Sequence, residues 1–136
     1  MAGVELKNSE AVERAIKGYE KRLKFQAPAW KVIKQQALAD ILKHFRDESS
    51  PTGKWKPSKR ALEHGGKTLQ DTGRLRNGTV AKSGADRVIV TNNVNYGSYH
   101  NNAKPGSKMP KRQFFWISDK AIQLMLKTMS KFIMGK

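Results

Sequence analysis

The sequence contains no cysteine among its 136 residues. Disulfide bonds, cysteine nucleophiles and thiolate metal ligands are therefore excluded, and the chain fits a reducing compartment. It also lacks any run of 18 apolar residues, which argues against a transmembrane helix. Residues 1–7 lack the apolar core of a signal peptide. We expect a protein without membrane contact that stays in the compartment where it is made.

Acidic side chains are scarce: 11 Asp and Glu stand against 27 Lys and Arg, a formal charge of +16. Residues 1–50 hold ten basic and seven acidic side chains, whereas residues 51–136 hold seventeen and four. This excess points to a polyanionic or acidic partner that contacts the second part. The apolar content of 38% suffices for one domain. We divide this single domain, residues 1–136, into a helical part (1–48), a loop-rich part (49–78), a β part with a basic loop (79–118) and a C-terminal helix (119–136).

The residue patterns of common catalytic sites are also missing. The three histidines, His44, His64 and His100, have no second ligand at metal-binding spacing, and we expect His44 and His100 to be structural, His100 at a strand end. No Gly-rich phosphate loop follows a predicted strand, and no Ser nucleophile elbow occurs. The sequence predicts no metal, no cofactor and no enzyme.

One triplet resembles a catalytic motif. Asp71-Thr72-Gly73 matches the aspartic protease triplet, whose two carboxylates share a proton on a dry, apolar floor. Here Gln70 and Arg74 flank the carboxylate, so we interpret the triplet as a turn in which Gly73 takes a positive φ.

Two helices are predicted at the N-terminus. Asn8 or Ser9 can cap the first, and Pro28 suits the first turn of the second, which runs to about Asp47. The sequence leaves open whether they form one kinked helix or a helical hairpin. The apolar stripe of the first helix consists of Val12, Ile16, Tyr19 and Leu23.

A lone tryptophan, Trp55, stands between Lys54 and Lys56 in the Lys-rich connection that follows. It can stack on a nucleotide base or hold the loop against the protein's own core. We favour the second role.

The β part begins with a predicted hairpin of residues 79–82 and 87–91, rich in β-branched side chains. After a turn around Asn95, residues 96–100 are predicted as a short strand or strand end, which would add a third strand to an antiparallel sheet. Residues 101–108 are predicted as an exposed, mobile loop. Together with the helices, this predicts an α+β fold.

The densest apolar run, Phe114 to Ile117, follows Pro110, which favours an extended chain. Alternate side chains of an extended chain face opposite sides. We therefore expect one pair of the run in the subunit core and the other against a neighbouring subunit or the terminal helices. Lys111 and Arg112 should carry charge outward, with Arg112 on the side of Phe114 and paired with an acidic group or a backbone carbonyl.

Ser118 or Asp119 can cap a last helix that runs to about Met134. Its apolar face can be plain core, which we favour, or an adaptable contact surface. This face consists of Ile122, Met125, Leu126, Met129, Phe132 and Ile133.

Several spaced elements combine between residues 40 and 118. They are Phe45, Pro51-x-Gly53-x-Trp55, Leu69-x-x-Thr72-Gly73-x-Leu75, Tyr96-x-x-Tyr99-His100 and Pro110-Lys111-Arg112-Gln113-Phe114. In this order the chain resembles the tailed-phage virion morphogenesis family, which includes tail completion and other neck proteins.

The resemblance implies a structural protein of the head-tail junction, made in the host cytoplasm and incorporated into the virion. It would form a ring of identical subunits, a hexamer or dodecamer, beside other neck, connector or tail proteins, with non-specific contact to DNA. The subunit interface candidates are Tyr99, His100, Pro110, Arg112, Phe114, Phe115 and Trp116. The candidates for facing DNA in the ring lumen are Lys54, Lys56, Lys59, Arg60, Lys104, Lys108 and Lys111.

The alternative is a sequence-independent nucleic-acid-binding module. The charge of residues 51–136 permits it, but interleaved aromatics, a helix-turn-helix and a zinc site are missing. A ring whose lumen passes DNA satisfies both hypotheses.

Overall fold

The computed structural model describes residues 9–70, 73–94, 96–102 and 110–135. This part of the chain is an α+β structure of helices and two small antiparallel hairpins, which confirms the predicted class. In chain order the elements are α1 (Ser9–Lys24), α2 (Ala27–Asp47), β1 (Ser49–Ser50), β2 (Gly53–Lys54), α3 (Lys59–His64), α4 (Arg74–Asn77), β3 (Thr79–Ser83), β4 (Val88–Asn92), α5 (Gly97–Asn102) and α6 (Asp119–Met134).

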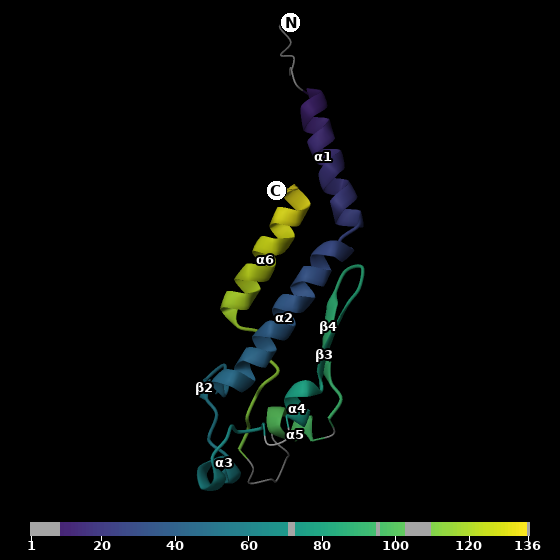
Figure 1. Cartoon of the computed structure of the whole chain (residues 1–136). Coiled ribbons are helices and arrows are strands. Elements are labelled where there is room, and N and C mark those ends of the chain that lie inside the picture. The colour runs from purple at the N-terminus through teal and green to yellow at the C-terminus, as the bar shows by residue number, and fades with distance from the viewer. Residues whose placement is uncertain (1–8, 71–72, 95, 103–109, 136) are drawn as a thin grey trace, which may run out of the picture.

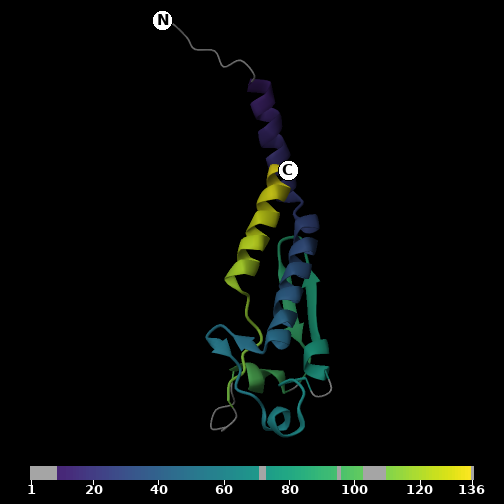
Figure 2. The ribbon, with the colours of Figure 1, turned by 60° about the vertical axis from the view of Figure 1, so that its left-hand side comes forward.

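Helix α2 is the centre of the structure, with α6 along one side and the β3–β4 hairpin along the other (Figure 1). After a break at Phe25 and Gln26, α2 leads away from the end of α1 at a clear bend, so the two form a kinked rod and not a hairpin (Figure 2). Pro28 lies in the first turn of α2, as predicted. Most of α1 extends beyond the rest of the molecule.

The contacts of α2 follow from its sequence. Ala29, Ile33, Ala37, Ile41 and Phe45 recur every four residues and are all buried. Residues four apart lie on one helical face, and the two alanines allow neighbouring elements to approach closely. The helix ends at Glu48, which takes a left-handed conformation and donates its backbone N–H to the carbonyl of His44.

The β3–β4 hairpin is confirmed, with Ala81 paired to Val90. These two side chains are half-buried, whereas Val80 and Ile89 point outward and are about half exposed. This alternation is that of a sheet with one covered face.

The predicted third strand at residues 96–100 is wrong: the chain forms helix α5 there. Gly97 donates its N–H to the carbonyl of Val94 and lies against the core. A Cβ at this position would come within 3.2 Å of Leu75 and 3.6 Å of Phe114. The glycine therefore lets the first turn of α5 pack directly on the core. Asn95, assigned to the preceding turn, lies outside the described residues, as do residues 103–109 of the predicted loop.

The part predicted to be loop-rich holds several short elements. β1 and β2 form a hairpin of two paired residues each, and Ser58 caps α3 by accepting the backbone N–H of Ala61. Gly73 has a φ of 73°, as predicted for the turn, and precedes α4. Asp71 and Thr72 lie outside the described residues.

Helix α6 has the predicted limits. The Ser118 hydroxyl accepts the N–H of Ala121, and Gly135 ends the helix in a left-handed conformation. The apolar face is only partly covered: Ile122 and Leu126 are 41% and 59% exposed. The prediction of a plain core face thus holds only for the half-buried members, which are Met125, Met129, Phe132 and Ile133. Within the described residues, no helix is long and apolar enough to cross a membrane.

Candidate interaction site

The aromatic residues of the spaced elements gather in one cluster. The ring of Phe45 lies 5.7 Å from that of Trp55, edge to face, and 5.1 Å from that of Phe114. Leu75 and Val94 complete the cluster, and Leu69 and Phe115 pack against it. Residues from five separate stretches thus form one core, where α2 meets the chain that precedes α6.

Trp55 holds its loop to this core. The side chain is 5% exposed, and its indole N–H donates to the carbonyl of Gln113 at 3.0 Å. The predicted structural role is therefore confirmed, and base stacking is excluded for this conformation. Because Trp55 points inward, its neighbours Lys54 and Lys56 remain exposed.

The chain from residue 110 to 118, here called the 110–118 segment, has no strand partner among the described residues. Side chains from elsewhere satisfy its backbone groups instead. The Asn101 side-chain oxygen accepts the N–H groups of both Phe114, at 3.1 Å, and Phe115, at 2.8 Å. Two successive N–H groups that converge on one oxygen are incompatible with an extended strand, in which they point to opposite sides.

This geometry corrects the predicted alternation of the aromatic run. Phe114 is 1% exposed, and Phe115 packs against the same cluster, with the two rings 5.0 Å apart. Trp116 stacks on His44 of α2 and donates its indole N–H to the Ser49 carbonyl at 3.2 Å. The subunit itself covers these rings at least partly.

Arg112 does not carry its charge outward. The residue is 6% exposed, its Nε donates to the Lys56 carbonyl at 2.8 Å, and its backbone N–H donates to the His100 carbonyl at 2.7 Å. The predicted pairing with a carbonyl is confirmed, whereas the outward orientation is wrong. Burial lowers the pKa of the guanidinium from its ordinary value. The bond from Arg112 to the Lys56 carbonyl joins the 110–118 segment to the loop after Trp55. Arg112 therefore stabilises the fold of the subunit.

His100 lies on α5, and not at a strand end. Burial, followed by the nearby Arg112 charge, lowers its pKa. Its ring meets that of Tyr96 edge to face at 5.9 Å. Both line a cavity of about 290 Å³ together with Arg60, Arg74 and Arg112.

The interface candidates are therefore reduced. Phe114 and Arg112 are buried in the subunit and inaccessible to a partner in this conformation, while Pro110, Phe115 and Trp116 keep part of their surface. The side chain of Tyr99 lies outside the described part of the structure.

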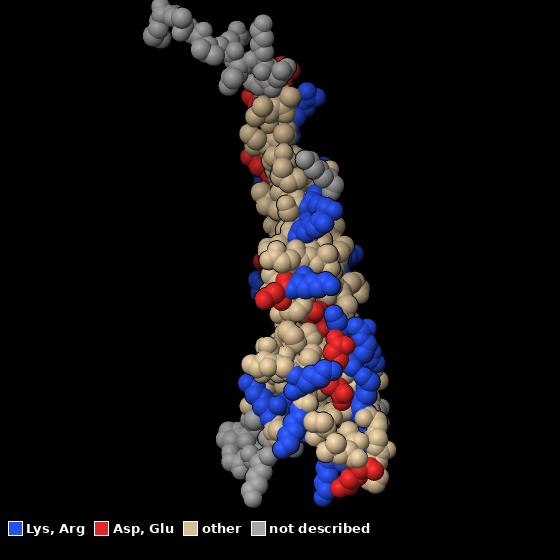
Figure 3. Space-filling view, turned by 90° about the vertical axis from the view of Figure 1, so that its left-hand side faces the viewer, with Lys and Arg blue, Asp and Glu red and all other residues tan. Residues whose placement is uncertain are grey.

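The basic candidates come from neighbouring elements. Lys54 on β2, Lys56, Lys59 on α3 and Lys111 are exposed, and these elements form the end of the molecule opposite to α1 (Figure 1). Arg60 is half-buried and donates to the Lys67 carbonyl at 2.7 Å. Lys104 and Lys108 lie outside the described residues. Lys and Arg side chains also continue along the α6 side of the molecule, with fewer acidic ones between them (Figure 3).

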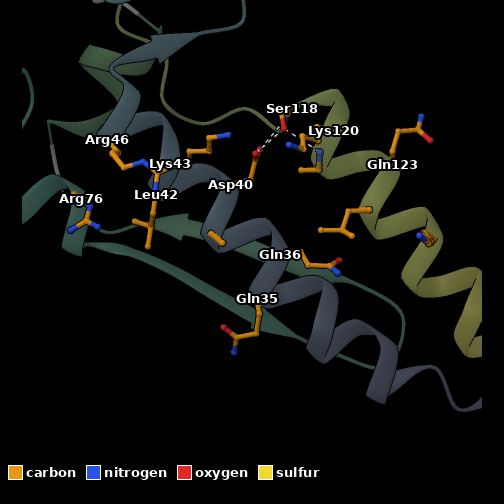
Figure 4. Close-up of a pocket in the computed structure, with 14 residues that line it drawn as sticks. Gln35, Gln36, Asp40, Leu42, Lys43, Arg46, Arg76, Ser118, Lys120 and Gln123 are labelled. Carbon is orange, nitrogen blue, oxygen red and sulfur yellow. Dashed lines mark hydrogen bonds between the residues drawn. The ribbon is translucent and has the colours of Figure 1, made fainter.

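A groove of about 900 Å³ runs between α2 and α6 (Figure 4). Its apolar lining comes from Ala39 and Leu42 of α2 and Ala121 and Leu124 of α6. Asp40 is engaged at one end, where its two oxygens accept the N–H of Ser118 at 2.8 Å and the hydroxyl of Ser118 at 2.7 Å. Five basic side chains also line it: Lys43, Arg46, Arg76, Lys120 and Lys127.

Sequence reasoning missed this groove and the role of Asn101. Asn101 acts on residues thirteen and fourteen positions away, and the groove joins two helices from opposite ends of the chain. One feature of the sequence indicated the groove: α2 and α6 have more apolar positions than one buried face of each helix requires.

No group of three His, Asp or Glu side chains close enough to hold a metal ion occurs within the described residues. Compared with known proteins, the chain matches no family model, no curated protein and no solved structure.

Proposed function

We propose that the protein is a structural component of a tailed-phage head-tail junction, a neck or tail completion protein that assembles into a ring around the DNA passage. One observation carries the proposal. Phe45, Trp55, Leu75 and Phe114, which lie in four of the spaced elements of the resemblance, form a single core cluster. Elements that share one core can be kept together by one fold, and this supports treating them as one set.

The exposed basic side chains support a role for DNA in this assembly. Residues 51–136 carry seventeen basic and four acidic side chains, and Lys54, Lys56, Lys59 and Lys111 are exposed at the end opposite to α1. In a ring, this end would face the lumen, where phosphates attract Lys and Arg whatever the base sequence. No catalytic role is part of the proposal.

The alternative, a nucleic-acid-binding module that acts without a ring, is favoured by the same charge. The two differ in assembly. Native mass spectrometry and electron microscopy of the purified full chain should show a closed ring, a hexamer or dodecamer, with a central opening. Monomers or two-fold dimers that bind DNA would support the alternative, because isologous dimers do not propagate into rings.

A further inference from the structure

A small cavity lies at the end of the molecule opposite to α1, where α3, α4, α5 and the 110–118 segment each contribute lining residues (Figure 1). Its volume is about 290 Å³, and three guanidinium groups line it: Arg60 of α3, Arg74 of α4 and Arg112 of the 110–118 segment. None of the described side chains that line it is acidic. Three cations around one cavity repel one another and attract an anion.

Arg112 is the most deeply buried of the three arginines. The residue is 6% exposed, and its Nε donates to the Lys56 carbonyl at 2.8 Å, whereas no described group accepts from its Nη1 and Nη2. A guanidinium has five N–H donors, and four of them are on these two nitrogens. Arg60 and Arg74 have further interactions of their own, such as the bond from Arg60 to the Lys67 carbonyl. The donors of Arg112 are therefore the ones on which an anion in the cavity depends most.

His100 adds a second buried group without a partner. Its Nδ1 is buried and has no hydrogen-bond partner within the described residues. Buried polar atoms are almost always bonded, so such an atom beside a cavity indicates a ligand or water. Burial, followed by the Arg112 charge, lowers the pKa of the ring, which is mainly neutral at pH 7 and keeps one N–H to donate. Because Nδ1 has no bond to lose, the ring can turn to an anion without breaking one.

The rest of the lining suits a small charged ligand above an apolar floor. Leu75 belongs to the core cluster, and Leu69 packs against it. The low polarity behind the arginines strengthens their attraction for an anion. The Ser58 hydroxyl accepts the N–H of Ala61 at 3.1 Å, and its own hydrogen remains for another acceptor.

The arrangement of the donors favours phosphate over carboxylate. The guanidinium groups come from three different elements, and each is a planar fork of N–H donors. A carboxylate has two oxygens in one plane, which one such fork already matches. A phosphate directs its oxygens to several sides, and its monoester carries more charge. Donors on several sides of one cavity therefore fit a tetrahedral anion better.

We propose that this cavity binds one phosphate group, held by Arg112 together with Arg60, Arg74 and His100. The site lies within one subunit, so it goes beyond the proposed function and exists with or without a ring. Two sources share this chemistry: the backbone of DNA, and a free phosphate or nucleotide.

Titration of the full chain with inorganic phosphate, at an ionic strength held constant with sodium chloride, tests the site. NMR spectra of the wild type should show saturable shifts of the His100 ring signals. Arg74→Gln should weaken phosphate binding at least about tenfold, because a charged donor is lost. Arg74 is exposed, so this change disturbs the fold less than a change at Arg112. Circular dichroism checks that the variant stays folded, and the wild-type titration is decisive without it.

Arg76→Gln is the matched control. Arg76 is also exposed on α4 and carries the same charge, but it does not line this cavity. Its replacement should change phosphate affinity by less than about twofold, because a more distant exposed charge is screened by salt. Equal weakening by Arg74→Gln and Arg76→Gln would reduce the effect to the general charge of the protein and overturn the proposal.

A short DNA duplex without terminal phosphates separates the two sources. If backbone phosphates occupy the site, the duplex should compete with inorganic phosphate, and Arg74→Gln should weaken duplex binding more than Arg76→Gln does. If a free phosphate or nucleotide is the ligand, a nucleoside monophosphate should compete, and the two variants should bind the duplex equally. Either result supports a phosphate site.

Three other results would overturn it. An absence of saturable shifts with inorganic phosphate would show that the cavity holds only water. Acetate that binds as tightly as phosphate would assign the site to a carboxylate, such as that of an acidic protein segment. Asp71, three residues before Arg74 in the sequence, is tested by Asp71→Asn. If this variant binds phosphate and the wild type does not, a carboxylate of the chain itself neutralises the arginines.

Discussion

The imidazole of His44 and the indole of Trp116 stack face to face, with ring centroids 3.8 Å apart and planes 9° apart. The Nε2 of His44 also lies 2.9 Å from the Trp116 carbonyl and 3.4 Å from Asp40. To bond that carbonyl, Nε2 must carry a proton, which selects the Nε2–H tautomer of the neutral ring. One side chain of α2 thereby holds both the ring and the backbone of the segment that leads into α6.

This pair predicts a pH-dependent stability. Burial lowers the pKa of His44 below its ordinary value, although the Trp116 carbonyl, Asp40 and Asp47 act in the opposite direction, and burial also lowers the pKa of His100. The unfolded chain then binds protons at a higher pH than the folded chain does. Stability should be fully present above about pH 6.5 and be lost as the pH falls through the folded pKa values.

Melting temperatures measured between about pH 7.5 and pH 5.5 test this expectation. His44→Gln should reduce the loss of stability on acidification, because the group whose pKa burial lowers is then missing. If the melting temperature of His44→Gln falls with pH as it does in the wild type, His44 is not the cause of the pH-dependent stability.

Phe114 is expected to contribute strongly to stability. The side chain is 1% exposed and contacts the rings of Phe45 and Phe115, so Phe114→Ala should cost about 3–5 kcal/mol through reduced burial and the cavity that remains. Phe115 is half-buried, and Phe115→Ala should cost less than about 2 kcal/mol. Urea unfolding of the two variants gives the comparison. Equal costs would contradict the core position of Phe114.

Elements governed by local chemistry could be predicted from the sequence. The limits of α6 follow from the Ser118 cap and the terminal Gly135, and the β3–β4 hairpin follows from β-branched residues around a polar turn. The structural role of Trp55 was predicted correctly because a large apolar side chain in a polar loop is stabilised by burial in the core of its own domain. These features depend on residues within a turn or two of each other.

Features that depend on distant contacts could not be predicted. Residues 96–100 have strand-like aromatics, but Gly97 fits the surface made by Leu75 and Phe114, and that contact favours helix α5. Arg112 is of a residue type usually found at the surface, but its Nε donates to the carbonyl of Lys56, which is 56 residues away in the chain, and this bond accompanies its burial. Tertiary contacts overrode local preference at both places.

Asn101 should prove structural. Its side-chain oxygen accepts the N–H groups of Phe114 and Phe115, and Asn101→Ala would leave these two part-buried donors without their acceptor. We expect a loss of about 1–3 kcal/mol. The neighbouring Asn102 is exposed, and its Oδ1 accepts the Asn101 Nδ2 at 2.9 Å. Because this bond is exposed to solvent, Asn102→Ala should cost less than Asn101→Ala, below about 1 kcal/mol. Thermal unfolding of the two variants gives the comparison. Equal losses of stability would show that the effect comes from disturbing α5 as a whole and not from the two bonds to Asn101.

DNA binding should be independent of sequence and steeply salt-dependent, because Lys and Arg contact phosphates. A variant with Lys54, Lys56, Lys59 and Lys111 all changed to Ala should bind more weakly, and the slope of log affinity against log salt should fall by roughly 0.9 for each phosphate that the variant no longer neutralises. The matched control changes four exposed lysines at the other end of the molecule, which are Lys17, Lys21, Lys24 and Lys31. If the control is weakened as much as the variant, or one DNA sequence is strongly preferred, the lumen assignment of the basic end is wrong.

Arg112 and Lys111 are adjacent, yet the structure predicts opposite consequences for their removal. The sequence pattern alone predicts that Arg112→Ala leaves the monomer folded and weakens assembly. The structure places Arg112 at 6% exposure, with its Nε on the Lys56 carbonyl. Arg112→Ala should therefore destabilise the monomer by about 1.5–3 kcal/mol, the range for a hydrogen bond to a charged group.

The exposed Lys111 provides the matched control, and Lys111→Ala should change the free energy of unfolding by less than about 0.5 kcal/mol. Arg112→Lys should recover only part of the stability, because an ammonium on a flexible stem replaces the planar guanidinium. Unfolding of the monomers in urea is to be compared with assembly measured well below the melting temperature of each variant. If Arg112→Ala melts like the wild type but fails to assemble, Arg112 acts at a subunit interface and does not stabilise the monomer.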